Sequence, residues 1–437
     1  MSLNVQLPLP PDPSLKPPPF APTIPDREHL RPTYAGEFRC TISACEETCC
    51  QGWSVPVDQA TWEKYRSNDI LRSHLGTLIV LNTSSPTTAD YARMPLLTTG
   101  QCGFLEPGNL CGIQNRFGPE MLSHTCRTYP RALSTHAAEI ETALNLSCPA
   151  AANLVLLNPN LLAIPVAARR YGPFHTLSTA SRLDLRDLAL LLLTDRNYPV
   201  WQRLFLLGTL TRRLQALAGD EPSGAWLDAH PIETAQLLRE TARSAASQRM
   251  RATLNRLPPD PAQQLQFVVQ LLQLRISQPP VPARFIECVQ DFERGIGIGT
   301  NDSEEALLER YGVADRLYLR PLLNQYPHLL ENYLLNHIFK NDYPFGRQTR
   351  QPRTSQPNAK DEHLSLCIHA ALAQTLLIGM AGHYREAFSK THVVKLIQCL
   401  ARTIEHSKTY LEQIMTLVQE RSVHPNPAVS TLFRIPG

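Results

Sequence analysis

The amino-acid sequence predicts a mainly α-helical protein in which a cysteine-rich, loop-rich metal-binding domain precedes an irregular all-α domain. Eight of the eleven cysteines lie between Cys40 and Cys148, a stretch with many turn signals and short apolar runs. From about residue 176 onward, apolar residues recur at helical spacing in a series of long segments, and no fixed-length repeat joins them. We expect a proline-rich leader at 1–33, the cysteine-rich domain at 34–165 and the helical domain at 166–437.

Composition narrows the functional class. A chain of 437 residues with 43% apolar residues can build two or three domains, and a net charge of +3 is too small to indicate a nucleic-acid partner. The N-terminus lacks the apolar core of a secretory signal, and the apolar stretch of residues 364–380 is interrupted by His369 and Gln374. We therefore expect a cytoplasmic protein without a membrane span, whose thiols stay reduced.

The leader, residues 1–33, holds ten prolines and should be extended. Either a flexible tail or an arm docked on a neighbouring surface fits this composition. In the cysteine-rich domain, Asp58 is expected to cap a helix that buries Trp62 and Tyr65. Short strands are predicted at 79–81 and at 140–146, with alternate residues of the second strand on one side.

The helical domain has recognisable helix ends. Asp302 and Glu305 are spaced as a capping box, and Gly219 follows one predicted helix. The proline pairs at 258–259 and 279–280 end two others. The polar, basic segment 346–363 is predicted to be a mobile loop. The G-x-G-x-G of residues 295–299 follows a helical pattern and not a strand, so we expect an interhelical loop there and not a nucleotide site.

The clustered cysteines indicate a metal centre. Four thiols occur within eleven residues, and an iron–sulfur cluster needs about four thiolates, several of them usually from one loop. The side chains of adjacent residues should point in different directions, so Cys49 and Cys50 are expected to serve different purposes. Zinc remains open, although paired C-x2-C knuckles are absent. The candidate ligands are Cys40, Cys45, Cys49, Cys50, Cys102, Cys111, Cys126 and Cys148.

Three cysteines lie apart from this group. Cys288, Cys367 and Cys399 occupy apolar helical patterns, where a buried and inert thiol is the usual case. We therefore assign the three outlying cysteines no chemistry.

The spacing C-x3-C-C of Cys45, Cys49 and Cys50 is shorter than the C-x3-C-x2-C of radical S-adenosylmethionine enzymes, which argues against simple membership of that class.

Several segments resemble the flagellin lysine-N-methylase family. The similarity begins with FRCTISACEETCCQGWSV, CGFLEPGNLCGIQNRFGPEMLSHTCRTYPR and LNLSCPAAANL, and continues in LLENYLLNHIFKNDYPFG and RTIEH of the helical half. It covers about residue 34 to the C-terminus. The chain departs from the family pattern at Ala150, where an acidic residue is expected, and at Asn153, where a basic one is expected.

The resemblance implies an activity and its cofactors. It implies methyl transfer from S-adenosylmethionine to the ε-amine of surface lysines on flagellin, with a 4Fe–4S cluster required. All eight clustered cysteines match the family motif, and the resemblance does not select four of them as ligands. The best matches are Cys45, Cys49, Cys50, Cys111 and Cys126. Because no Rossmann pattern is present, we expect the donor to bind beside the cluster, and an iron with a free coordination site is one hypothesis for how it is held.

A neutral lysine amine is needed for this reaction, and its ordinary pKa is about 10.4, so a base or desolvation must assist. Glu106, Glu120, Glu141 and Glu405 are candidates, and those we select from the family-like segments are Glu331, Tyr333 and His406. Each also fits a salt-bridged or solvated helix position. An acidic face of a protein substrate could meet Arg127, Arg131 or the basic loop, namely Arg347, Arg350, Arg353 and Lys360.

Two other functional classes remain open from the sequence. In one, a zinc-stabilised N-terminal domain supports a helical adaptor that binds flagellar or other proteins without catalysis. In the other, an iron–sulfur protein transfers electrons and no methyl group. Metal analysis with a visible spectrum distinguishes the zinc adaptor from an iron–sulfur protein. Incubation with labelled methyl donor and flagellin distinguishes the electron carrier from a methyltransferase.

Overall fold

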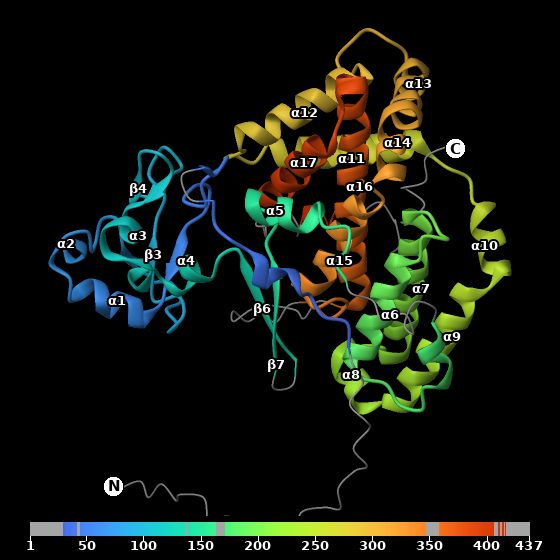
Figure 1. Cartoon of the computed structure of the whole chain (residues 1–437), viewed down its shortest axis with the longest axis horizontal. Coiled ribbons are helices and arrows are strands. Elements are labelled where there is room, and N and C mark those ends of the chain that lie inside the picture. The colour runs from blue at the N-terminus through green and yellow to red at the C-terminus, as the bar shows by residue number, and fades with distance from the viewer. Residues whose placement is uncertain are drawn as a thin grey trace, which may run out of the picture.

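A small cysteine-rich part lies beside a larger helical body (Figure 1). The computed structural model describes residues 29–41, 44–136, 139–162, 171–346, 358–405, 410, 413–414 and 416. Within them the chain is mainly helical and its strands are confined to the N-terminal part, so the predicted fold class is confirmed. Most of the leader lies outside the described residues.

Short strands organise the cysteine-rich part. β1 (Val55–Val57), β3 (Ala92–Met94) and β2 (Val80–Leu81) form an antiparallel sheet in the order β1-β3-β2, with Val55 opposite Met94. β4 (Leu105–Glu106) pairs with β5 (Leu110–Cys111). The strand predicted at 79–81 is thus confirmed within one residue.

Helix α1 (Gln59–Arg66) closes the apolar core of this part. Asp58 caps it, because its Oδ1 accepts a hydrogen bond from the Thr61 amide at 3.0 Å, and Trp62 and Tyr65 are buried as predicted. The remaining short helices are α2 (Asp69–Arg72), α3 (Gly112–Phe117) and α4 (His124–Thr128). Their apolar side chains, with those of β1 and β3, form a core separate from that of the helical body.

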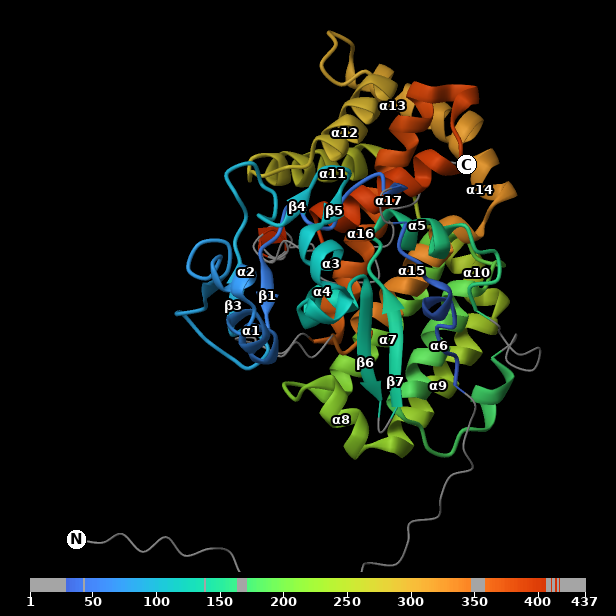
Figure 2. The ribbon, with the colours of Figure 1, turned by 60° about the vertical axis from the view of Figure 1, so that its left-hand side comes forward.

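A hairpin of β6 (Arg131–His136) and β7 (Glu139–Leu144) connects the two parts and leads to α5 (Pro149–Leu156). In Figure 2 it lies between the cysteine-rich part and the helices. The strand ends at Leu144 and not at 146. Its regular pairing with β6 places Ile140, Thr142 and Leu144 on one side, as predicted, but that side is not uniformly buried. Ile140 is 70% exposed near the tip, whereas Ala143 and Leu144 are both buried where the hairpin meets the helical body.

The helical body is built around one long helix. α16 (Ala359–Tyr384) contacts α12, α7, α13 and α17, and nearly all of its middle is buried. The other helices are α6 (Arg182–Thr194), α7 (Val200–Ala218), α8 (Ser223–Ala229), α9 (Pro231–Ala246), α10 (Gln248–Asn255), α11 (Pro261–Ile276), α12 (Ala283–Ile296), α13 (Glu304–Ala314), α14 (Arg320–Gln325), α15 (His328–Asn341) and α17 (Lys390–Thr403).

The segment of α16 has the length and hydropathy of a membrane-crossing helix. In the window that meets this criterion, however, 89% of the residues are buried inside the protein. Neighbouring helices cover it, as expected for the central helix of a helical domain. The same helix corrects the predicted loop 346–363, because residues 359–363 are helical and Asn358 caps them, accepting from the Asp361 amide at 2.9 Å. Residues 347–357 lie outside the described residues.

Helix ends mostly follow the sequence signals. Gly219 ends α7, and α10 and α11 end before the two proline pairs. The predicted capping box is wrong, because α13 begins one residue later than expected. Ser303 caps it, accepting from the Ala306 amide, while Asp302 is paired with Arg310 at 2.8 Å.

The glycine-rich segment 295–299 joins α12 to α13, as predicted, but its glycines have different tasks. Gly297 ends α12 with φ of +83°, a conformation that favours glycine. Gly295 lies inside α12 against α16, where an added Cβ would stand 1.7 Å from the Gly379 carbonyl oxygen. This glycine therefore permits close packing of the two helices.

Candidate functional site

Five of the eight clustered cysteines line one small cavity in the cysteine-rich part. The sulfur-bearing residues are Cys49, Cys50, Cys102, Cys111 and Cys126, and the cavity measures about 30 Å³. The rest of its wall is largely apolar, with Val55, Met94, Phe104, Ile113 and Leu122 among the lining residues. We call it the five-cysteine cavity.

Local backbone structure brings these cysteines together. The Cys102 amide donates to the Cys50 carbonyl at 2.8 Å, which joins the first cysteine loop to the second. Cys111 immediately precedes α3, and Cys126 lies in the first turn of α4, where its amide donates to Ser123 Oγ at 3.2 Å. Turns and single-turn helices, and not long elements, therefore position the thiols.

Hydrogen bonds among the thiols divide them into two kinds. Donation from Cys50 lowers the pKa of Cys111 to about 6, and backbone amides at the start of α3 assist. The neighbouring Cys50 thiol also lowers the pKa of Cys49 to about 7, while the pKa of Cys50 itself is raised, because its one proton is shared between the Cys49 and Cys111 sulfurs. Burial raises the pKa of Cys126 to about 12. Cys49 and Cys111 are thus the thiols of this cavity that lose their protons most readily.

The other three cysteines lie elsewhere. Cys148 precedes α5, where burial, followed by the nearby Cys45 and Cys40, raises its pKa to about 11. The Cys45 thiol donates to the Glu47 carbonyl at 2.6 Å. None of the three lines the five-cysteine cavity. The predicted set of eight therefore separates into five and three.

Within the described part of the chain, no three His, Cys, Asp or Glu side chains are arranged to hold one metal ion. A zinc ion holds four ligands in a tetrahedron, with sulfur at about 2.3 Å, and no such arrangement occurs among these residues. The five thiols are gathered at one place without forming a finished single-ion site.

A larger cavity of about 370 Å³ adjoins the first and shares Cys49, Trp53 and Tyr129 with it. It lies between the cysteine-rich part and the helical body, which contributes Arg275 and Arg402. Such a volume is within the range of small-molecule sites. We call it the interface cavity.

The helical body holds the first cysteine loop in place. Arg402 of α17 donates to Glu47 Oε2 at 3.1 Å and to the backbone carbonyls of Thr48 and Gln51. Gln398, one turn earlier, donates to Glu47 at 2.7 Å and to the Ser147 carbonyl at 2.9 Å. The sequence analysis missed this role of α17, because the polar residues of an amphipathic helix do not reveal which of them contact another segment.

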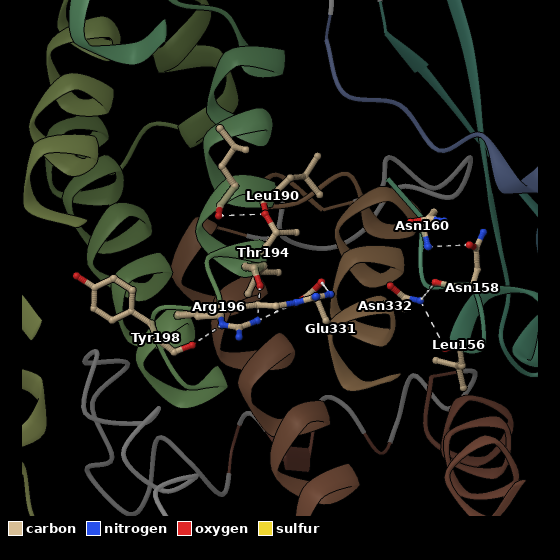
Figure 3. A network of polar contacts seen from close by, with 12 residues as sticks. Leu156, Asn158, Asn160, Leu190, Thr194, Arg196, Tyr198, Glu331 and Asn332 are labelled. Carbon is tan, nitrogen blue, oxygen red and sulfur yellow. Dashed lines mark hydrogen bonds and ion pairs between the residues drawn. The ribbon is translucent and has the colours of Figure 1, made fainter. Parts of the chain in front are cut away.

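Glu331, a predicted catalytic residue, is held by two arginines (Figure 3). Its Oε1 accepts from Arg196 at 2.9 Å and its Oε2 from Arg203 at 2.9 Å, and the carboxylate is buried. It lines a separate cavity of about 740 Å³ in the helical body and not the interface cavity. Its catalytic role stays a prediction, and its contacts are those of a structural ion pair.

Tyr333, the second predicted catalytic residue, donates to Glu405 Oε1 at 3.4 Å, and burial raises the pKa of its hydroxyl. Glu405 is also paired with Lys340. Burial opposes the charge on Glu405, but Lys340 and the neighbouring His369 and His337 outweigh it and lower its pKa to about 2. This buried network does not line either cysteine-bounded cavity.

The third predicted catalytic residue, His406, lies outside the described residues, as do three residues of the predicted basic loop, at 347, 350 and 353. Arg127 is exposed on α4, whereas Arg131 lines the interface cavity. Of the other glutamates, Glu106 is paired with Arg116 and Glu141 with Arg186. The arginines Arg131 and Arg275 are thus the described basic residues, besides Arg402, at the interface cavity.

Comparison with known proteins finds a matching family and several similar proteins. The family profile described as FliB lysine N-methylase C-terminal domain matches residues 186–432. A flagellar biosynthetic protein, FliU, of Salmonella muenchen is 31% identical over 135 residues, which are 30% of this chain and 79% of FliU. Lysine-N-methylases of Salmonella typhimurium and Salmonella choleraesuis are 31% identical over 135 residues, which are 33% of each of these enzymes. No solved structure matches.

Proposed function

We propose, on the premise that the chain belongs to the FliB lysine N-methylase family, that it methylates surface lysines of flagellin with S-adenosylmethionine as donor and a 4Fe–4S cluster as cofactor. The observation that carries the proposal is the five-cysteine cavity beside the interface cavity. One cavity gathers thiols and the other has room for a small molecule. The relatives' names, which refer to lysine methylation and flagellar biosynthesis, support the reaction and the substrate.

The donor set suits an iron–sulfur cluster. Cys49, Cys50, Cys102, Cys111 and Cys126 would supply its ligands, one more thiol than the usual four. The two thiols with lowered pKa favour thiolate ligation. The proposal requires these side chains to turn toward a common centre on loading. A bound cluster would supply a redox-active iron centre and would tie the loops together.

The reaction balances without a further reagent. The neutral lysine nitrogen attacks the methyl carbon, an N–C bond forms, and the C–S bond breaks with its electron pair left on sulfur. The products are methyllysine and S-adenosylhomocysteine, and one proton leaves the nitrogen. The chain must therefore desolvate the lysine or pass its proton to a base. The proposed compartment is the cytoplasm, where the thiols stay reduced.

The test is a methyl-transfer assay on anaerobically purified full-length protein with labelled S-adenosylmethionine and flagellin. We expect labelled flagellin, iron and sulfide in the protein, and broad visible absorption. Cys49→Ser and Cys111→Ser should each lower the iron content, the absorption and the activity together. Cys367→Ala, which removes a buried thiol of α16 outside the cavity, is the matched control and should keep all three.

Two results would contradict the proposal. A colourless zinc protein that binds flagellin without labelling it would support the adaptor. Iron and visible absorption without any methyl transfer would support electron transfer. If Cys49→Ser and Cys111→Ser both keep iron and absorption, these residues leave the ligand set.

A further inference from the structure

We propose that the interface cavity is the methyl-donor site, and that Arg131 binds the carboxylate of the donor's amino-acid part while Trp53 stacks against its adenine. This inference rests on the proposed function and adds the residues that would recognise the donor. Both residues line the cavity, and so does Cys49, which joins it to the five-cysteine cavity.

The charges of the cavity call for an anionic group on its ligand. Arg131, Arg275 and Arg402 line it, and no carboxylate does. Arg275 is buried and donates to the backbone carbonyls of Thr403 at 2.9 Å and Pro280 at 3.1 Å, so its charge has no counter-ion among the described residues. The charge of Arg402 is balanced by its ion pair with Glu47. A net positive, partly enclosed site favours a carboxylate.

Arg131 is the arginine best placed to make the contact. Its guanidinium lies over the Phe38 ring, 5.3 Å from the centroid, and forms no ion pair with a described residue. A guanidinium fixed on an aromatic face keeps its N–H groups for a bidentate carboxylate. The N–H groups of Arg275 and Arg402 are already engaged by carbonyls and Glu47. These two arginines would therefore contribute positive electrostatic potential more than direct hydrogen bonds to the ligand.

Aromatic side chains line the same cavity. The Trp53 indole is held by donation from its Nε1 to the Cys49 carbonyl at 2.8 Å, and its ring centroid is 6.0 Å from that of Tyr129. A fixed, half-buried indole is a stacking surface for a nucleobase. The donor carries a carboxylate beside its own ammonium and sulfonium cations, and a lysine side chain has no anionic group for the arginines to hold, so the carboxylate is what points to the donor.

Isothermal titration calorimetry of full-length protein with two ligands tests the assignment. S-adenosylhomocysteine carries the carboxylate, and 5′-methylthioadenosine lacks the whole amino-acid part. Arg131→Gln should weaken the binding of S-adenosylhomocysteine about tenfold or more. It should leave the binding of methylthioadenosine unchanged, because only the first ligand has a carboxylate for the guanidinium. Trp53→Leu should weaken both about tenfold, and Trp53→Phe should recover most of the loss.

Arg127→Gln is the matched control, since it makes the same charge change on the exposed face of α4 and should bind both ligands as the wild type does. The assignment would be overturned if Arg131→Gln bound S-adenosylhomocysteine as the wild type does, or if it lost affinity for both ligands equally. Either result would leave the proposed function intact. The same holds if Arg131→Gln affects only flagellin binding. If the wild type binds neither ligand, the donor named in the proposed function is wrong as well.

Discussion

The Arg402 guanidinium lies 3.1 Å from the Glu47 carboxylate, a contact between the last described long helix and the first cysteine loop. Both side chains are about 85% buried, as their exposed fractions are 14% and 15%. Arg402 also donates to two backbone carbonyls of the same loop, those of Thr48 and Gln51. The loop that carries Cys49 and Cys50 is therefore held by the helical body and not by regular structure of its own.

Removal of this contact should loosen the loop. Arg402→Gln is expected to cost about 1–3 kcal/mol in the free energy of unfolding, because a charge-assisted hydrogen bond to Glu47 is lost. Amide hydrogen exchange of residues 44–53 should quicken. Lys395→Gln is the control on the same helix as Arg402. It breaks a partly exposed pair with Glu287 of α12 and should change neither the stability nor the exchange appreciably. Equal exchange in both variants would contradict the role of Arg402.

Glu331 is expected to stabilise the helical body. Glu331→Gln leaves the buried Arg203 without its counter-ion, so we expect a loss of about 3–5 kcal/mol in urea unfolding. Arg196→Gln removes only the half-exposed partner and should cost about 1 kcal/mol or less. If Glu331→Gln abolished methyl transfer with unchanged stability, the predicted catalytic role would be supported instead.

The buried pair of Lys340 and Glu405 should behave similarly. Lys340→Met leaves the Glu405 carboxylate buried without its cation, and we expect a loss of about 3–5 kcal/mol at neutral pH. The double variant Lys340→Met/Glu405→Leu should recover part of this loss, since no uncompensated charge remains. A double variant no more stable than Lys340→Met would contradict the ion-pair account. Urea denaturation measures all three proteins.

The same pair predicts a pH dependence. The pKa of Glu405 falls from its ordinary 4.5 to about 2 in the folded protein, so its contribution is complete above about pH 4.5. It is lost as the pH falls from 4.5 toward 2 and the carboxylate becomes protonated. The stability difference between wild type and Glu405→Gln should therefore shrink across this window. A constant difference would mean that Glu405 does not titrate with the predicted shift.

Close packing of α12 on α16 depends on Gly295. Gly295→Ala would place a methyl group 1.7 Å from the Gly379 carbonyl oxygen, so the helices must separate, and we expect a loss of about 1–3 kcal/mol or more. Gly36→Ala is the control, because nothing lies within 4 Å of its added Cβ. Thermal unfolding measures both variants. If Gly295→Ala were as stable as Gly36→Ala, the packing account would be wrong.

Local signals predicted local structure well. Asp58 capped α1, Gly219 ended α7 and the apolar periodicity gave the helices, because each depends on residues within a few positions. Errors arose where neighbours in space decided the outcome. Ile140 and Leu144 lie on one side of β7, yet Ile140 is exposed and Leu144 is buried, because it is the Leu144 end of the strand that packs in the core of the helical body. The cap at Ser303 in place of Asp302 was a one-residue shift.

The candidate site was predictable only as a set of residue types. Eight clustered cysteines indicated thiolate chemistry, and the family resemblance gave the reaction. Which five thiols share a cavity did not follow from spacing, since Cys45 lies four residues from Cys49 and still lies outside it. The selected residues Glu331 and Tyr333 occupy buried networks, and only the structure reveals the arginines and the lysine around them.

By itself, the sequence determined the helical class, the clustering of the cysteines and the family, because composition, periodicity and motifs are properties of the linear chain. The tertiary structure decided which thiols converge and that Arg131, Arg275 and Arg402 surround a cavity beside them. The physical reason is that burial and charge compensation depend on groups brought together from distant segments. Arg402 reaches Glu47 across 355 positions of the chain, a separation that no local pattern encodes.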